Sequence, residues 1–153
     1  MVRGNQRRIL KAAEDICSKE GLRFTPKRKE IFKMMLHEKK ALSAYEIADC
    51  LKAKTNISIP VMSVYRILEF LEQIKLVHKI SSINRYSVCS HISCKHKHLM
   101  PRLAVCRKCK HVDELAANNS IKESLQKSLN AVDFQLESQQ IELFGLCSGC
   151  TAK

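Results

Sequence analysis

Four cysteines near the end of the sequence form two Cys-x-x-Cys pairs. The first pair is Cys106 and Cys109, and the second is Cys147 and Cys150. Two such pairs can supply the four thiolates of a closed, tetrahedral zinc site, and a site of this kind contributes directly to folding. The alternative is a set of incidental thiols, which would require the same spacing to arise twice by accident. The sequence therefore predicts a structural four-thiolate zinc site.

A second set of potential metal ligands lies earlier in the chain. Imidazole and thiolate with one carboxylate form a borderline-soft donor set, which suits zinc better than iron(II) or manganese(II). A single histidine near a hairpin is more often a surface or hydrogen-bonded residue, so each ligand is a separate hypothesis. The sequence does not decide between the two histidines at 96 and 98. The predicted ligands of a regulatory zinc are His78, Cys89, His96 or His98, and Glu114.

The chain has eight cysteines, and their use depends on the compartment. Residues 1–22 interleave polar and apolar residues and lack the apolar core of an export signal. Pro60 and Arg66 interrupt the longest apolar stretch, residues 57–76, so no transmembrane helix is expected. We therefore expect a cytoplasmic protein that uses cysteines for metal rather than for disulfides. Cys17, Cys50 and Cys94 are interpreted as packing or spare thiols, with Cys94 the best metal ligand of the three.

The charge of the chain favours a polyanionic partner. The formal net charge is +12, and residues 1–80 carry 17 of the 27 Lys and Arg but nine of the 15 Asp and Glu. Neutralising phosphates releases counterions and provides affinity that does not depend on base sequence. A basic surface that only maintains solubility is the alternative. If the partner is nucleic acid, it should meet the N-terminal half.

The first half of the sequence predicts four helices and a hairpin. Helical spacing covers residues 5–20, and Gly21 follows as a stop. Further helices begin at Thr25-Pro26, at a capping box formed by Ser43 and Glu46, and at Pro60. Side chains then repeat with a period of two at Leu76, His78 and Ile80 and again at Tyr86 and Val88, which indicates two strands around a turn at residues 81–84. Together these elements predict a winged helix-turn-helix.

The composition changes at Cys89, where histidines and cysteines become frequent. Short strands are expected at residues 103–105 and 112–115, followed by a helix from a second capping box, Ser120 to Glu123, to about residue 130. A final strand is expected over residues 134–144. The predicted class is mixed α and β (α+β), with a DNA-binding domain at 1–88, a connection at 89–102 and a second domain at 103–153.

At this point the sequence resembles the Fur family of metal-dependent repressors over nearly its whole length. The resemblance implies a winged-helix N-terminal domain, an α/β dimerisation domain, a structural zinc and a regulatory metal at the hinge. The motifs that carry it are Thr25-Pro26-x-Arg28, Ser43-Ala44-Tyr45-Glu46, Ser63-Val64-Tyr65-Arg66, His78-Lys79 and the two Cys-x-x-Cys pairs.

The sequence departs from the pattern of the iron sensors at three points, and at these points it resembles the zinc-uptake branch of that family. Ala41 stands where iron and manganese sensors usually have a histidine, and no histidine follows His111. Cys89 occupies a position that is usually an oxygen ligand in those sensors. One feature fits neither pattern: the pair His96 and His98 lies farther from the first cysteine pair than the family's histidine cluster does.

The resemblance also suggests which residues contact DNA. Arg66, on the helix that begins at Pro60, can pair with guanine, and Tyr45 can touch a thymine methyl or a phosphate. The basic first turn of the second helix would hold phosphates, unless it is only a solvated helix start. The further contacts expected are Ser63, Tyr65, Lys27, Arg28 and Lys29.

The resulting hypothesis is a homodimeric, zinc-responsive repressor with zinc as corepressor, bound to double-stranded operator DNA. Two zinc ions per chain, no membrane and no small-molecule substrate are expected, and the resemblance implies zinc-uptake genes as targets. An iron, manganese or peroxide sensor is the nearest alternative. A zinc-dependent hydrolase, a thiol oxidoreductase or a zinc-ribbon adaptor is the alternative from another class. We expect no enzyme, because each cysteine pair has the other as its partner.

Overall fold

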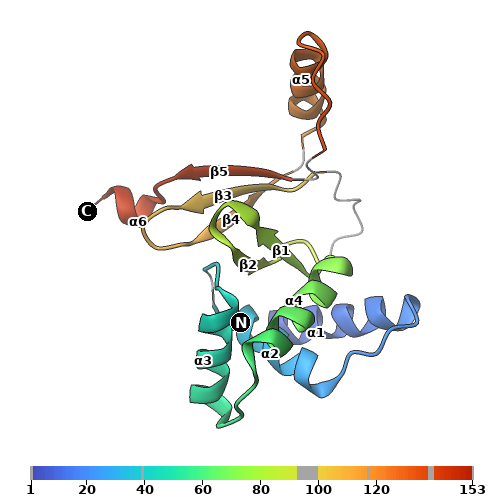
Figure 1. Cartoon of the computed structure of the whole chain (residues 1–153), viewed down its shortest axis with the longest axis vertical. Helices are drawn as coiled ribbons and strands as arrows, with labels where there is room; N and C mark the ends of the chain where they lie inside the picture. Colours follow the sequence, from blue (N-terminus) through green and yellow to red (C-terminus); the bar gives the residue numbers. More distant parts are fainter. Residues whose placement is uncertain (1, 39, 93–99, 117, 138–139, 153) are drawn as a thin grey trace.

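The structure is a computed structural model that describes residues 2–38, 40–92, 100–116, 118–137 and 140–152 (Figure 1). It confirms a mixed α and β fold, with helices concentrated in the first half and a three-stranded sheet in the second. The elements are α1 (Val2–Lys19), α2 (Pro26–His37), α3 (Ala44–Thr55), α4 (Val61–Gln73), β1 (Val77–Ile80), η1 (Ser81–Ile83), β2 (Arg85–Val88), β3 (Arg102–Cys106), β4 (Val112–Leu115), α5 (Asn119–Asn130), β5 (Ile141–Gly145) and α6 (Ser148–Thr151).

Local sequence signals set the end of α1 and the starts of α2 and α3 as predicted, whereas α1 begins at Val2 and not near residue 5. The Thr25 hydroxyl accepts from the backbone N–H at the start of α2, where Pro26 is the first residue. Ser43 and Glu46 form the capping box of α3, with the Ser43 N–H donating to the Glu46 carboxylate at 2.7 Å. Gly21 has a φ of +66°, the left-handed conformation that ends a helix at little cost when no side chain is present.

The first hydrophobic core lies between these four helices. Val64 and Leu68 on one side of α4 are fully buried, and they pack in the same cluster as Phe32 of α2 and Ala13 of α1. Cys17 is 1% exposed in this cluster, in agreement with its interpretation as a packing residue. Because one face of α4 is committed to the core, its opposite face is available to solvent.

The wing is an antiparallel hairpin that follows α4. Strands β1 and β2 pair from Val77 opposite Val88 to Ile80 opposite Arg85, and Asn84 turns the chain with a φ of 49°. Leu42, between α2 and α3, forms a further backbone bridge to Tyr86 in β2. The helices and the hairpin together make the winged helix-turn-helix that the sequence predicts.

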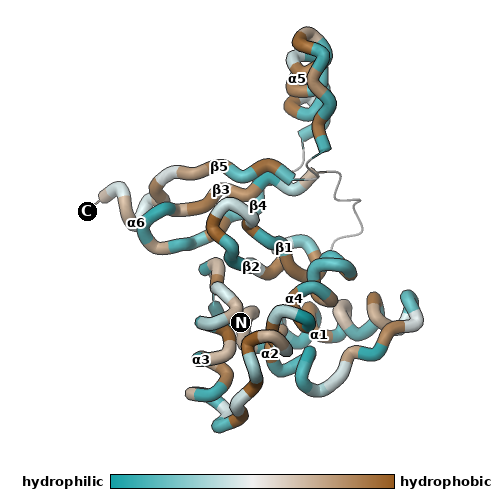
Figure 2. The backbone as a smooth tube through the Cα atoms, in the orientation of Figure 1, coloured by the Kyte–Doolittle hydropathy of each residue, from teal (hydrophilic) through white to brown (hydrophobic). Residues whose placement is uncertain are grey.

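The C-terminal sheet has the strand order β4-β3-β5, antiparallel between β3 and β4 and parallel between β3 and β5. Its central strand is strongly hydrophobic (Figure 2), and Leu103 and Val105 are buried. They share a second core cluster with Ala41 and Ile80, which come from the first half of the chain. The two halves therefore pack on each other, and the predicted division at residues 88 and 103 stays a prediction.

Hydrogen bonds also join the wing to the C-terminal sheet. The Glu142 carboxylate on β5 accepts from the Ser81 N–H at 2.8 Å and from the N–H and hydroxyl of Ser82. Gln140 donates to the Lys79 carbonyl at 2.5 Å. Burial alone would raise the pKa of Glu142, but the hydrogen bonds that it accepts from Ser82, Ser81 and Gln140 outweigh burial and lower it. The carboxylate therefore holds the wing most firmly in its ionised form.

Two expectations for the C-terminal half are wrong. Asn118 is the N-cap of α5 and accepts from the Ser120 N–H, so Ser120 lies within the helix and does not start a capping box. The last strand begins at Ile141 and not at Phe134, because only residues from Ile141 onward pair with β3. The Phe134 N–H instead donates to the Leu129 carbonyl and finishes the end of α5.

Helix α5 stands away from the rest of the molecule, at the top of Figure 1. None of its described residues is buried, although its sequence is amphipathic: Ile121 is 48% exposed and Val132, just after the helix, is 70% exposed. Across the described part of the chain, no helix combines the length and apolar character needed to cross a membrane.

Candidate metal centres and DNA-binding surface

The four cysteines predicted to bind zinc come together at one end of the C-terminal sheet. Cys106 ends β3, Cys109 lies in the turn that leads to β4, and Cys147 and Cys150 belong to the start of α6. The four sulfur atoms all lie within 4.8 Å of one another. The Cys109 and Cys147 sulfurs are 3.6 Å apart, too far for a disulfide. A tetrahedral site with zinc–sulfur bonds of about 2.3 Å has sulfurs about 3.8 Å apart, so this arrangement fits zinc.

Backbone geometry holds these thiols in place. The Lys110 N–H donates to the Cys106 carbonyl, and Lys110 has a φ of 63°, which turns the chain back toward β4. The N–H of Cys109, followed by that of Cys147, lowers the pKa of the Cys106 thiol to about 5. Burial and the neighbouring thiols raise the pKa of Cys150 to about 12. A cation that binds all four sulfurs would have to displace the protons of the less acidic thiols.

The second candidate centre joins the wing to the C-terminal sheet. His78 comes from β1, Cys89 follows β2 directly, and Glu114 lies on β4. Their ligand atoms are within 4.8 Å of one another. Cys89 is positioned by its N–H, which donates to the Leu76 carbonyl at 3.0 Å and continues the hairpin by one residue. Three of the predicted ligands therefore meet, although they lie up to 36 positions apart in the sequence.

The side chain of Glu114 is 4% exposed, less than that of His78, which is 10% exposed. Its Oε2 lies 3.3 Å from Nε2 of His78 and accepts from the Ser90 N–H at 3.0 Å. Its Oε1 lies 3.1 Å from Nδ1 of His91. Burial alone would raise the pKa of Glu114, but His78, the Ser90 N–H and His91 outweigh burial and lower it to about 2. The carboxylate is therefore ionised and ready to bind a cation.

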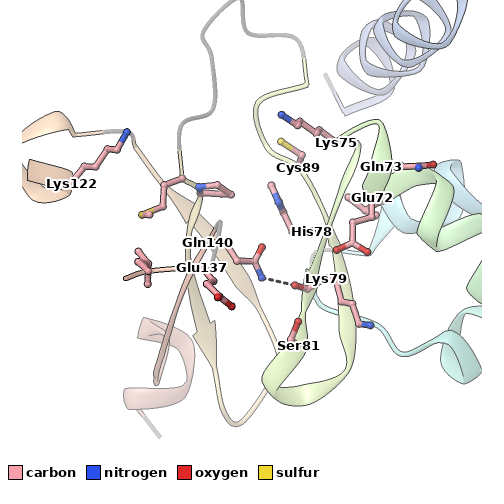
Figure 3. Close-up of a pocket in the computed structure, with 14 residues that line it drawn as sticks. Glu72, Gln73, Lys75, His78, Lys79, Ser81, Cys89, Lys122, Glu137 and Gln140 are labelled. Carbon is pink, nitrogen blue, oxygen red and sulfur yellow. Dashed lines mark hydrogen bonds between the residues drawn. The ribbon is translucent and has the colours of Figure 1, made fainter. Parts of the chain in front are cut away.

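A cavity of about 740 Å³ opens beside this centre, between the wing and the C-terminal half (Figure 3). Cys89 and His78 lie next to each other in its wall, and Gln140 faces them from the other side. The cavity gives an ion a path from solvent to these two ligands. The predicted ligands His96 and His98, and the spare thiol Cys94, lie outside the described residues.

The predicted DNA contacts lie on the helices of the first half. Tyr45, in the first turn of α3, is 63% exposed, and Arg66 on α4 is exposed. Ser63 and Tyr65 are half-buried, and Tyr65 packs against the core of the four helices. Arg66 therefore has the freest access to solvent of the three predicted contacts on α4.

The basic first turn of α2 is only partly free. Lys27 is exposed, but the Arg28 guanidinium lies 3.5 Å from the centre of the Phe70 ring and donates to the Arg23 carbonyl. Lys29 forms an ion pair with a glutamate of α1, Glu14. Of the three predicted phosphate contacts in this turn, Lys27 is thus the one for which the described residues show no competing interaction.

Two residues with a place at these sites are not among the predicted ones. His91 contacts Glu114, and its only signal in the sequence is its membership of the run of histidines and cysteines that begins at Cys89. Met62, in the first turn of α4, is 66% exposed and lies on the same helix as Arg66. Periodicity marks Met62 only as a residue outside the core stripe of α4.

Comparisons with known proteins agree with this architecture. The chain is 34% identical to the zinc uptake regulation protein of Escherichia coli K12 over 93% of this chain and 81% of that protein. A solved zinc uptake regulator complexed with zinc and DNA superposes with a TM-score of 0.82 at 29% identity, covering 96% of this chain and 95% of that one.

A third relative is known in two forms. Holo XcZur superposes with a TM-score of 0.73 at 31% identity, covering 94% of this chain and 97% of that one. Apo XcZur superposes with a TM-score of 0.53 at 29% identity, covering 95% and 97%. The sequence model of the ferric uptake regulator family matches residues 19–144. The chain therefore belongs to the ferric uptake regulator family.

Proposed function

We propose that this protein is a zinc-responsive DNA-binding repressor in which zinc acts as corepressor of zinc-uptake genes. The observation that carries the proposal is the meeting of His78, Cys89 and Glu114 within 4.8 Å, with ligands from both halves of the chain. The E. coli relative is a zinc uptake regulation protein, which supports the choice of target genes. The protein acts as a regulator and not as an enzyme, and its operator partner implies a cytoplasmic location.

The hinge centre links metal binding to the arrangement of the two halves. His78 and Cys89 approach from the wing, whereas Glu114 approaches from β4, so all three ligands are available only when the halves pack together. Bound zinc would act as a Lewis acid that accepts an electron pair from each of these three ligands and so links the two halves. A ligand that binds one of two arrangements more tightly shifts the equilibrium toward that arrangement, by at most the ratio of its two affinities. The structure superposes better on holo than on apo XcZur, which supports its interpretation as the metal-binding arrangement.

The donor set favours zinc over the metals of the alternative sensors. A thiolate and an imidazole with one carboxylate suit zinc, whereas iron(II) and manganese(II) sites contain more oxygen donors. A histidine from residues 96 or 98 would complete a tetrahedral shell around the three described ligands. With the four-cysteine centre, which also fits zinc, the proposed content is two zinc ions per chain.

DNA recognition is assigned to the exposed face of α4. Arg66 would read a base edge in the major groove, and Tyr45, Lys27 and the other predicted contacts would position the protein on the duplex. Met62, the exposed residue in the first turn of α4, would enter the groove first. The relative solved with zinc and DNA supports this mode of binding.

The proposed assembly is a homodimer that places two copies of α4 on a palindromic operator. Its interface is assigned to exposed apolar residues on and just after α5 and β5, because apolar side chains gathered on an exposed surface mark an interaction site. These residues are Ile121 on α5, Val132 and Phe134 after it, Leu143 on β5 and Leu146 after it.

The direct test is fluorescence anisotropy of a labelled promoter duplex from the zinc-importer operon, titrated with protein at buffered free zinc, iron(II) or manganese(II). Tight binding with zinc alone would support the proposal. Equal or tighter binding with iron(II) or manganese(II) would assign the protein to another kind of sensor. Failure to bind with any of the three metals would contradict its role as a DNA-binding repressor.

A further inference from the structure

We propose that His91 is a positioning residue for the hinge zinc: its imidazole holds one oxygen of the Glu114 carboxylate so that the other faces the metal. The inference rests on the zinc centre of the proposed function. It assigns a role to a histidine that is not among the predicted ligands. It also explains how a single carboxylate from the C-terminal sheet is aimed at two ligands of the wing.

The two oxygens of Glu114 have different surroundings. Oε2 faces the metal ligands, 3.3 Å from Nε2 of His78, and also accepts from the Ser90 N–H. Oε1 lies 3.1 Å from Nδ1 of His91. The side chain of Glu114 is 4% exposed and that of His91 is 29% exposed, so little water competes for this contact. The two oxygens thus have separate partners, and Oε2 is the one next to the zinc ligand His78.

His91 acts through Glu114 rather than as a ligand itself. The group of ligand atoms within 4.8 Å of one another comprises those of His78, Cys89 and Glu114, and neither ring nitrogen of His91 joins it among the described residues. A nitrogen that contacts the far oxygen of a carboxylate is placed to orient that group. Metal-binding carboxylates usually have such partners, and their loss typically reduces metal affinity about 10–100-fold.

The location of His91 ties this positioning to the closed arrangement. His91 follows Cys89 by two residues and so moves with the wing, whereas Glu114 belongs to the C-terminal sheet. When the halves separate, Glu114 loses His91 and the Ser90 N–H together with the two zinc ligands of the wing. His91 therefore adds to the preference of zinc for the closed form without contacting zinc.

The test compares the full-length dimer, with its four-cysteine zinc in place, as wild type, His91→Ala and His91→Asn. The Asn side chain retains an N–H donor near the position of Nδ1, so it should rescue a positioning role. His111→Ala is the matched control, because His111 also lies near a carboxylate, that of Asp113, but outside the hinge centre. Each protein receives cobalt(II) at the hinge for its absorption spectrum, and zinc affinity is measured by competition with a chromophoric chelator.

We expect His91→Ala to bind one hinge cobalt per chain, with the thiolate charge-transfer band of Cys89 retained and the ligand-field bands altered. Its zinc affinity should fall about 10–100-fold. His91→Asn should recover most of the affinity and the wild-type spectrum, and His111→Ala should match wild type. A change confined to folding would not move the ligand-field bands of the folded fraction.

If wild type binds the hinge metal normally, two results would overturn the role of His91 and leave the proposed function intact. An unchanged spectrum and zinc affinity in His91→Ala would show that His91 does not orient Glu114. Loss of the hinge metal as complete as that in a Cys89→Ala protein measured in parallel would make His91 a ligand. If the wild-type chain itself bound no hinge metal, the proposed function would fail first, and this inference with it.

Discussion

Glu114→Gln is the substitution that separates zinc binding from zinc-dependent closure. Among the ligands that the structure describes, Glu114 alone comes from the C-terminal sheet, whereas His78 and Cys89 belong to the wing. Glutamine keeps the shape of the side chain and an oxygen that can accept from the Ser90 N–H. We therefore expect the variant to fold normally and to bind zinc more weakly, with little preference for the closed arrangement.

The size of the effect follows from what else holds the halves together. The Ala41 N–H donates to the Lys110 carbonyl at 2.8 Å, and Glu142 accepts from Ser81. Each such bond contributes about 0.5–1.5 kcal/mol, so closure does not depend wholly on metal. A coupling of about 1–3 kcal/mol then suffices, which corresponds to a 5–150-fold gain in operator affinity on adding zinc. Glu114→Gln should reduce this gain to about twofold or less, whereas operator affinity without zinc should be unchanged.

The assay is anisotropy of the labelled promoter duplex at fixed ionic strength, with and without saturating zinc. Asp113→Asn is the matched control, because it removes the same charge from the preceding residue of β4 at a side chain that is 66% exposed. A Glu114→Gln protein that kept the full gain of wild type would refute the argument that this carboxylate couples zinc to closure.

Four further predictions follow from other parts of the structure. Cys147→Ser should lose one zinc per chain by metal analysis and melt at a lower temperature, since structural zinc contributes to folding; an unchanged zinc content would contradict the four-cysteine centre. Arg66→Ala should lower operator affinity by about 1–3 kcal/mol and relax preference at one base pair, whereas Lys27→Ala should weaken binding to all duplexes and reduce the salt slope by about one; equal losses on operator and random DNA would argue against base reading by Arg66. Because the pKa of Glu142 is lowered from its ordinary value of 4.5 in the folded protein, its stabilising effect is present above that value and is lost as the pH falls through the folded-state pKa. The difference in melting temperature between wild type and Glu142→Gln should therefore shrink in acid, and a constant difference would exclude this contribution. Phe32→Ala should reduce the free energy of unfolding by about 3–5 kcal/mol in urea titrations, because Phe32 is fully buried; a loss below about 1 kcal/mol would mean that the core refills the cavity.

The parts of the fold that the sequence predicts well depend on short-range signals. Thr25-Pro26 and the capping box of Ser43 and Glu46 start helices because their partners lie within three residues. The two cysteine pairs are equally local, and only their mutual approach depends on the tertiary fold. His78, Cys89 and Glu114 could be named as ligands by residue type, but their meeting depends on packing between the wing and the sheet.

The errors arise where the local pattern fits more than one structure. Asn118 and Ser120 are both good N-cap residues, and the start of α5 uses Asn118, which the local pattern does not rank above Ser120. The alternation from Phe134 onward resembles a strand, yet only residues with a partner on β3 become one. The contact of His91 with Glu114 is likewise invisible in a sequence where several histidines lie close together.

The most direct test of the central claim is the reciprocal measurement of zinc affinity at the hinge, by chelator competition, with and without saturating operator duplex. If His78, Cys89 and Glu114 couple zinc to the arrangement that grips DNA, the duplex must raise zinc affinity by the same factor by which zinc raises operator affinity. A zinc affinity that the duplex leaves unchanged, beside a zinc-dependent gain in DNA binding at another site, would contradict the hinge as the sensing centre.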